Sequence, residues 1–237
     1  MTKKEKTDPS EKSKDLFISI ASHKLFTPIT VIKLRIELLL NDRSLTKSVR
    51  GQLNETLKSV AKLEDFANVL LRISDVIEVK DDDIREINVK KLITAVISDF
   101  TDTAMQKKIK FKIDYDKNTL IKVNFKDSYL RYILSSIIEN SIKYGKDGGH
   151  INVECSISNK KVNISVADDG AGIPENELNM LFRSFFRGTN VQKLDVNGYG
   201  LSLYTVKLLV DRLGGKIRGE SRESAGTKFT IEFKNNS

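Results

Sequence analysis

The segment from Ser136 to Tyr144 carries polar side chains at helical spacing. Ser136, Asn140, Lys143 and Tyr144 stand at i, i+4, i+7 and i+8, so in a helix they share one face. An asparagine oxygen is a ligand that Mg²⁺ accepts, and a lysine ammonium neutralises phosphate. The spacing therefore indicates a site for a magnesium-bound triphosphate, with an ordinary solvated helix face as the alternative.

A glycine-containing segment follows at the end of a predicted strand. Asp168 comes directly after the apolar run Val162–Ala167 and is followed by Gly170 and Gly172. The glycines let the backbone turn sharply and approach a flat ligand. The Asp168 carboxylate offers an acceptor to an exocyclic amine. Such a segment is a weak signal by itself.

Two further glycine-containing segments lie later in the chain. Gly198 and Gly200 immediately precede a predicted helix, Leu201–Leu213, and the free N–H groups at the start of a helix can point at phosphate. Gly226 and Thr227 open the last predicted strand. Each segment alone is modest, but the order in which they follow one another favours a nucleotide site.

A histidine on the predicted first helix is a candidate nucleophile. With Ile18 at heptad position a, His23 falls at position f and points away from the apolar seam. Pro28 follows on the same helix, where it removes a backbone donor and kinks the axis. An imidazole is substantially neutral near pH 7 and is then nucleophilic. A plain surface histidine is the alternative that this position alone leaves open.

The elements that must position these residues begin with two long helices. Only one glycine, Gly51, precedes Tyr144, whereas twelve lie beyond it. From Lys14 to Asn41 apolar residues form a heptad seam, made of Ile18, Leu25, Ile32 and Leu39, with Ile29 and Ile36 between them. A second helix, starting near Thr46, repeats the pattern. The seam is too large for one hairpin to cover, which predicts dimerisation into a four-helix bundle.

Beyond a predicted hinge at Asp81–Asp83, short strand-type runs alternate with helices. The predicted strands are Lys108–Tyr115, Leu120–Phe125, Ile151–Ser158, Lys161–Ala167, Lys216–Ser221 and Lys228–Phe233. The predicted helices are Val89–Met105, Asp127–Tyr144 and Leu201–Leu213. This alternation predicts an α/β sandwich. The expected division is a charged tail over 1–13, a helical domain over 14–80 and a second domain over 84–237.

Composition limits the partners that the chain can have. The formal net charge of +8 leaves a nucleic-acid partner open, but basic and acidic residues are interleaved, which favours a lysine-rich solvated surface. The longest apolar runs are too short to cross a bilayer. Cys155 is the single cysteine, which agrees with a reducing compartment.

The segment Phe17–Thr30, FISIASHKLFTPIT, resembles the phosphoacceptor box of histidine kinases, in which Ser-His precedes an acidic residue and then Leu-Arg-Thr-Pro-Leu-Thr. The resemblance implies that His23 is phosphorylated and that Thr27 is the hydroxyl residue linked in this family to phosphatase activity. Two positions depart from the family pattern. Lys24 replaces the acidic residue that assists proton removal, and Phe26 replaces the arginine. The first departure predicts slow autophosphorylation.

The later segments resemble, in order, the motifs of the GHKL ATPase superfamily, which histidine kinases share with gyrase and heat-shock chaperones. The corresponding boxes are Ser135–Tyr144 (N box), Asp168–Gly172 (first glycine box), Phe182–Arg187 (F box), Gly198–Leu203 (second glycine box) and Gly226-Thr227 (last box). This motif order is that of histidine kinases, and the resemblance covers nearly all of Phe17–Phe233.

By this resemblance Asn140 ligates Mg²⁺ and Asp168 reads the adenine amine of ATP, while Lys143 and Tyr144 contact phosphate and nucleotide. The remaining nucleotide-binding residues that it implies are Gly170, Gly172, Arg187, Gly198, Gly200, Leu201 and Thr227. Gly198 and Gly200 are also expected to anchor a mobile lid, Glu175–Asn197. Ser136 stands where the family usually has a second asparagine, and Ser202 where it commonly has glycine.

The resemblance implies an ATP-dependent protein-histidine kinase that passes its phosphoryl group to an aspartate of a response regulator. We expect a homodimer through the N-terminal helices, with no nucleic-acid partner. We also expect a cytoplasmic location without membrane contact in this chain, either as a soluble kinase or as the cytoplasmic part of a longer membrane sensor. The main alternative is a dimeric scaffold that senses ATP without autokinase activity, or a phosphatase of the response regulator.

Overall fold

The structure, a computed structural model, describes residues 9–77, 84–115, 121–192 and 199–234. These residues form two compact units, one within residues 1–80 and the other within residues 81–237. The hinge predicted at Asp81–Asp83 and the tail predicted over 1–13 fall wholly or mostly outside the described residues. Each unit is described by itself below.

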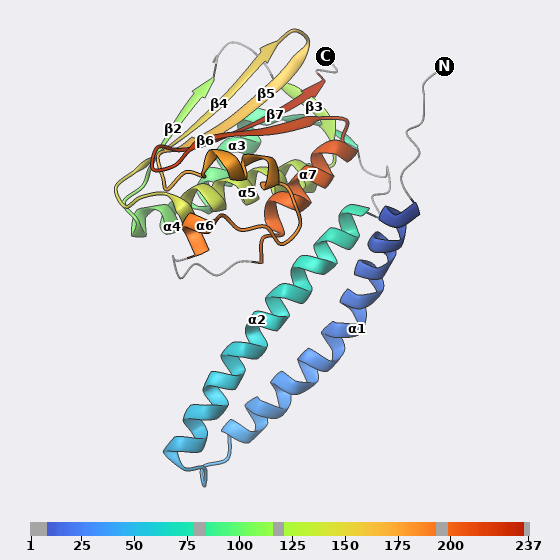
Figure 1. Ribbon diagram of the computed structural model, residues 1–237, viewed down its shortest axis with the longest axis vertical. Coiled ribbons are helices and arrows are strands. Elements are labelled where there is room, and N and C mark those ends of the chain that lie inside the picture. Colours follow the sequence, from blue (N-terminus) through green and yellow to red (C-terminus); the bar gives the residue numbers. More distant parts are fainter. Residues whose placement is uncertain (1–8, 78–83, 116–120, 193–198, 235–237) are drawn as a thin grey trace. The chain divides into compact units, whose positions relative to one another are not determined.

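The first unit is a hairpin of two long helices, α1 (Pro9–Leu40) and α2 (Lys47–Ile77), as Figure 1 shows. The residues that pack the helices together share one stripe on each helix: Ile29, Ile36, Val60 and Ala67. An ion pair between Lys33 and Glu64, 2.7 Å long, also joins the two helices. The predicted pair of N-terminal helices is therefore confirmed.

The turn of this hairpin is held by a basic side chain. The Arg50 guanidinium donates to the carbonyl oxygens of Leu40 at 2.7 Å and Asp42 at 2.9 Å. Carbonyl groups at the end of a helix have no partner in the helix itself, and a nearby cation also interacts favourably with the helix dipole. Arg50 thus ends α1 and fixes the start of α2.

The second unit contains a five-stranded mixed sheet. Its strands are β2 (Lys110–Tyr115), β4 (His150–Ser158), β5 (Lys161–Asp168), β6 (Lys216–Arg222) and β7 (Gly226–Lys234). They lie in the order β2-β4-β5-β7-β6. Only β2 and β4 pair in parallel, and the other pairs are antiparallel. A separate two-stranded sheet pairs β1 (Arg85–Asn88) with β3 (Lys122–Phe125).

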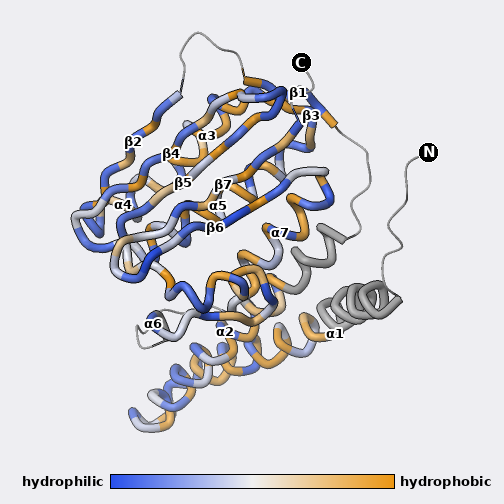
Figure 2. The backbone as a smooth tube through the Cα atoms, turned by 45° about the horizontal axis from the view of Figure 1, so that its top comes forward, coloured by the Kyte–Doolittle hydropathy of each residue, from blue (hydrophilic) through white to orange (hydrophobic). Residues whose placement is uncertain are grey.

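Three helices cover one face of the large sheet: α3 (Val89–Asp99), α5 (Asp127–Tyr144) and α7 (Ser202–Arg212), as Figure 1 shows. The strands alternate between apolar and polar residues, which Figure 2 shows as a change of colour along each strand. The apolar side chains of the strands face the helices. Ile164 in β5 and Leu134 in α5 are both fully buried in the core between them. The predicted α/β sandwich is therefore confirmed.

Cys155 lies in this core. Burial raises the pKa of its thiol to about 12, against a smaller opposing effect of Lys90. Because the thiolate is the reactive form of cysteine, this residue acts as a core side chain.

The observed elements differ from the predicted ones at a few places. The helix predicted over Val89–Met105 is interrupted at Phe100, after which a short helix, α4 (Thr101–Gln106), begins. Neither glycine nor proline marks this break, so the sequence pattern did not reveal it. The strand β1, the 3₁₀ helix η1 (Glu175–Met180) and the helix α6 (Thr189–Gln192) were not predicted either, because runs of four to six residues carry too little periodicity.

Within the described residues, no helix has both the length and the apolar character needed to cross a membrane.

The two-residue turn between β4 and β5 provides a test of the fold. Asn159 and Lys160 both have positive φ values, 51° and 57°, as a type I′ turn requires. Glycine is favoured at the second position because it adopts positive φ without steric cost. We therefore expect Lys160→Gly to stabilise the protein by about 1 kcal/mol in urea unfolding.

A matched control for this substitution is Lys112→Gly, at an exposed position of β2. Glycine weakens a strand interior, so this variant should be less stable than the native protein. A loss of stability in Lys160→Gly similar to that of the control would contradict the type I′ assignment.

Candidate functional site

The C-terminal half of α5 carries the polar residues predicted to bind nucleotide. Asn140, Lys143 and Tyr144 are half-buried, and the apolar face of the same helix is packed under the sheet. Ser136 differs from the prediction, because its side chain is only 6% exposed and belongs to the buried part of the helix. The candidate nucleotide-binding residues of α5 are therefore confined to its last two turns.

Burial and a nearby cation shape the charges at this end of α5. Burial lowers the pKa of Lys143; Glu139 opposes this shift and the charge of Arg187 adds to it. Burial also raises the pKa of Tyr144, against a smaller effect of Arg187. Arg187 lies in the segment between η1 and α6, far from α5 in the sequence. The fold thus brings three of the predicted nucleotide-binding residues together.

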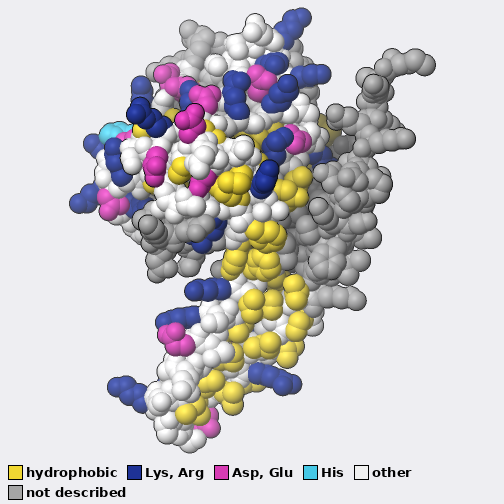
Figure 3. Space-filling view, viewed as in Figure 1, with side chains coloured by type: hydrophobic (Ala, Val, Ile, Leu, Met, Phe, Trp, Pro, Cys, Tyr) yellow, Lys and Arg dark blue, Asp and Glu magenta, His cyan; other side chains and the backbone are white. Residues whose placement is uncertain are grey.

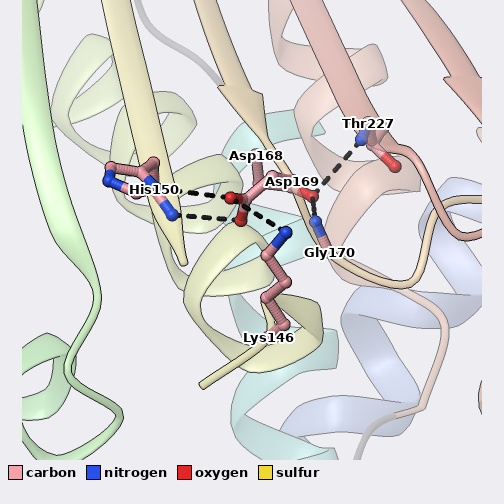
Figure 4. Close-up of polar contacts among 6 residues, drawn as sticks. All are labelled: Lys146, His150, Asp168, Asp169, Gly170 and Thr227. Atoms are coloured by element: carbon pink, nitrogen blue, oxygen red, sulfur yellow. Dashed lines mark hydrogen bonds and ion pairs between the residues drawn. The ribbon is translucent and has the colours of Figure 1, made fainter. Parts of the chain in front are cut away.

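Asp168 stands at the end of β5, where its carboxylate is held by backbone groups, as Figure 4 shows. One carboxylate oxygen accepts hydrogen bonds from the N–H groups of Gly170 at 3.0 Å and Thr227 at 3.3 Å. Burial raises the pKa of this carboxyl, the two hydrogen bonds act in the opposite direction, and neighbouring Asp169 raises it further. Asp168 is therefore a partly desolvated acceptor in a fixed orientation, suited to an amine donor.

Asp169 points to a different group of residues from those that hold Asp168 (Figure 4). Its carboxylate accepts the backbone N–H of His150 at 3.0 Å, and its other oxygen lies 3.4 Å from His150 Nδ1 and 3.3 Å from Lys146 Nζ. Burial acts to raise the pKa of Asp169, but these interactions outweigh it and hold the pKa below its ordinary value. This role of Asp169 was not predicted, although two adjacent aspartates after a strand were an available signal for it.

The glycines beside Asp168 are required by close contacts inside the domain. A Cβ atom on Gly170 would meet the carbonyl oxygen of Tyr144, and one on Gly172 would meet the carbonyl oxygen of Arg222. Gly172 also has a φ of +64°, which favours glycine. The first glycine box thus packs directly against the end of α5, and its predicted contact with the nucleotide stays a prediction.

The second glycine box is described only in part. Gly200 has a φ of +66°, and a Cβ there would meet the carbonyl oxygen of Phe186. Leu201 is buried and precedes α7, where its carbonyl oxygen accepts the Thr205 hydroxyl at 2.8 Å. Gly198 lies outside the described residues, as does the part of the predicted lid at 193–197.

The residues predicted for phosphoryl transfer lie on α1. His23 and Lys24 fall within this helix, but their side chains lie outside the described part of the chain. Thr27 and Pro28 follow, and both are exposed in the hairpin. Their predicted roles are not tested by this geometry.

Residues 125–237 match the family model for the histidine kinase-, DNA gyrase B-, and HSP90-like ATPases. The matched region contains every nucleotide-binding residue predicted above, from Asn140 to Thr227. The second unit therefore has the GHKL ATPase fold that the resemblance implied.

Similar proteins with curated names are sensor kinases. The chain is 26% identical to the signal transduction histidine-protein kinase ArlS of Staphylococcus haemolyticus, over 92% of this chain and 48% of that protein. It is 27% identical to the sensor histidine kinase WalK of Bacillus subtilis, over 99% of this chain and 38% of that protein. The chain thus spans about half or less of the length of these relatives.

Solved structures agree with both parts of the fold. The catalytic domain of the histidine kinase ThkA matches with a TM-score of 0.57 and 28% identity, over 65% of this chain and 96% of that one. Full-length ShkA matches in fold with a TM-score of 0.75 and 22% identity, over 92% of this chain and 45% of that one. In sequence and in fold the chain thus resembles histidine kinase catalytic cores.

The contrasting environments of the two aspartates lead to a prediction. Because the pKa of Asp168 is raised by burial, its ionised form lowers stability above that pKa, and this penalty is absent at lower pH. Asp168→Asn keeps the oxygen that accepts from Gly170 and Thr227 and removes the charge. We expect an unchanged or higher melting temperature near pH 7, and an ATP affinity weaker by about 1–3 kcal/mol.

Asp169→Asn is the matched control for this substitution. The pKa of Asp169 is depressed, so its ionised form adds stability at neutral pH, which is lost as the pH falls through the depressed value. This variant should therefore melt at a lower temperature than the native protein. Calorimetry showing native ATP affinity in Asp168→Asn would remove Asp168 from the adenine site.

Proposed function

We propose that this chain is an ATP-dependent protein-histidine kinase of two-component signalling. ATP with Mg²⁺ binds the second unit, the γ-phosphoryl group is transferred to His23, and an aspartate of a response-regulator receiver domain then accepts it. The observation that carries the proposal is that Lys143, Tyr144 and Arg187 lie close together in a domain that also holds the partly buried acceptor Asp168.

The charges of this site match the two ends of ATP. Asp168 presents an oriented carboxylate that can accept from the adenine amine. Lys143 and Arg187 are close enough to repel each other, and bound phosphate would stabilise both cations. A ligand with an amine donor at one end and a polyanion at the other therefore satisfies both groups of residues.

The Mg²⁺ ion expected with ATP needs few ligands from the protein. No cluster of three or more histidine, cysteine or acidic side chains that could hold a metal occurs within the described residues. Mg²⁺ bound to ATP takes most of its oxygen ligands from phosphates and water, so it needs few from the protein. The half-buried Asn140 can supply one amide oxygen without adding charge. Mg²⁺ would offset phosphate charge during transfer.

The transfer step itself uses a neutral imidazole. A lone pair of a His23 ring nitrogen attacks the γ-phosphorus, the bond to the bridging oxygen breaks, and ADP leaves with that oxygen. The proton on the imidazolium is then released. The chain contributes mainly by positioning the phosphate and neutralising its charge. The lid predicted over Glu175–Asn197 would exclude water from the γ-phosphate.

The test is incubation of the chain with γ-labelled ATP and Mg²⁺. Label on a histidine should be lost in acid and kept in alkali, and His23→Gln should carry none. ATP binding without any labelling would instead favour the ATP-sensing scaffold. Loss of label from a phosphorylated receiver domain, dependent on the exposed Thr27, would favour a response-regulator phosphatase.

Lys24 sets the expected rate of this labelling. An acidic neighbour would orient the imidazole and stabilise the cation that forms on it, whereas Lys24 places like charge nearby. We therefore expect slow labelling in the native chain and faster labelling in Lys24→Glu. Positioned acid–base groups contribute a factor of about 10²–10⁴, so partial restoration is measurable. If Lys24→Glu is labelled more slowly, Lys24 takes part in the reaction.

We also propose that two copies of the hairpin pair into a four-helix bundle. Figure 3 shows a band of hydrophobic side chains along the hairpin. Exposed hydrophobic residues of the hairpin include Leu25, Ile32 and Leu39, which share one face of α1, and Leu63 of α2. Exposed apolar patches of this kind mark protein contacts. Ile32 and Leu39 belong to the predicted heptad seam and remain 47% and 52% exposed in one chain.

Sedimentation of the full chain at micromolar concentration tests this assembly. We expect a dimer for the native protein and a monomer with retained helicity for Ile32→Glu, since a buried carboxylate would disfavour the bundle. Glu37→Lys, at an exposed polar position of the same helix, is the matched control and should remain dimeric. A native monomer would contradict the bundle.

A further inference from the structure

Lys107, at the end of α4, contacts the end of α5. Its ammonium donates to the carbonyl oxygens of Ile142 at 3.0 Å and Lys143 at 2.9 Å, and lies 3.4 Å from that of Gly145. The side chain is half-buried. One cation therefore collects three carbonyl groups from the last turn of the helix and the residue that follows it.

Elementary physics explains why a cation binds there. The last carbonyl groups of a helix have no partner within it, and the helix dipole places negative potential at this end. Hydrogen bonds from a charged donor are about twice as strong as neutral ones. Arg50 makes the same kind of contact at the end of α1, where it binds the carbonyl oxygens of Leu40 and Asp42.

The backbone of Lys107 holds the adjoining loop as well. Its carbonyl oxygen accepts the N–H of Gly148 at 2.8 Å. On the other side of the same turn, the carbonyl oxygen of Tyr144 accepts the N–H of Ala171 at 3.1 Å. The end of α5 is thus fixed between Lys107 and the first glycine box.

We infer that Lys107 is a positioning residue for the phosphate-binding part of the nucleotide site. Its ammonium binds the backbone of Lys143 itself and so fixes where the side chains of Asn140, Lys143 and Tyr144 are presented. Asp168 is held by other groups, the N–H groups of Gly170 and Thr227. Loss of the Lys107 charge should therefore disturb phosphate binding more than adenine binding.

This inference rests on the proposed ATP site, and its test separates the two ends of the ligand. Lys107→Met keeps the length of the side chain and removes the ammonium. We expect its affinity for Mg-ATP to fall by about tenfold, which corresponds to one charged hydrogen bond. Its affinity for adenosine, measured by NMR titration, should stay near the native value.

Two matched variants complete the experiment. Lys107→Arg should recover most of the Mg-ATP affinity, because a guanidinium also binds helix-end carbonyls in this chain, as Arg50 does. Lys110→Met changes an exposed lysine of β2 and should bind both ligands as the native chain does. Thermal unfolding of each variant reports any loss of stability separately.

The ratio of the two affinities decides between positioning and a structural role alone. If Lys107→Met melts earlier but keeps the native ratio of Mg-ATP to adenosine affinity, Lys107 only stabilises the fold and the inference is wrong. If Lys107→Met does not fold, Lys107→Gln, which keeps a neutral donor, is measured in the same way and decides by the same ratio. A native chain that binds no Mg-ATP overturns the proposed function itself.

Discussion

The carbonyl groups at the C-terminal end of α5 need partners from outside the helix, and they find them on two sides. Lys107 binds those of Ile142 and Lys143, and Ala171 binds that of Tyr144. Buried carbonyl groups without partners are costly. The end of α5 is therefore stabilised where the Lys107 ammonium and the Ala171 N–H both reach it. The same turn carries Lys143 and Tyr144, so a requirement of backbone hydrogen bonding also fixes the candidate site.

The sequence predicted the parts of this site that depend on local spacing. The helical period placed Asn140, Lys143 and Tyr144 on one face, and the strand predicted to end at Ala167 ends at the next residue, Asp168. Ser136 shows the limit of this reasoning, because the period gives the face of a helix but not how far the covering layer extends along it. The contacts of Lys107 join residues distant in sequence, and no local pattern reveals them. Two adjacent aspartates mark Asp169 as a candidate, but its partner His150 is also distant in sequence.

The helical hairpin shows a related limit. Its heptad pattern predicted two long helices, and the structure has them. The pattern does not say which stripe packs within one chain. Ile29 and Ile36 are buried against α2, whereas Ile32 and Leu39 of the predicted seam stay exposed. One chain therefore satisfies part of its apolar pattern, and the remainder is the physical basis for a second copy.

Two polar groups of the candidate site, Asp168 and Lys143, are held in environments unfavourable to their charge. Burial opposes ionisation of Asp168 and protonation of Lys143, and Arg187 adds repulsion to the latter. These costs lower the stability of the domain without ligand. A ligand that pairs with the carboxylate and with the cations removes these costs. Because the ligand binds only the folded state, it also raises the stability of the domain by mass action. The energetic cost of holding these charges in the fold thus becomes part of the affinity for a ligand that pairs with them.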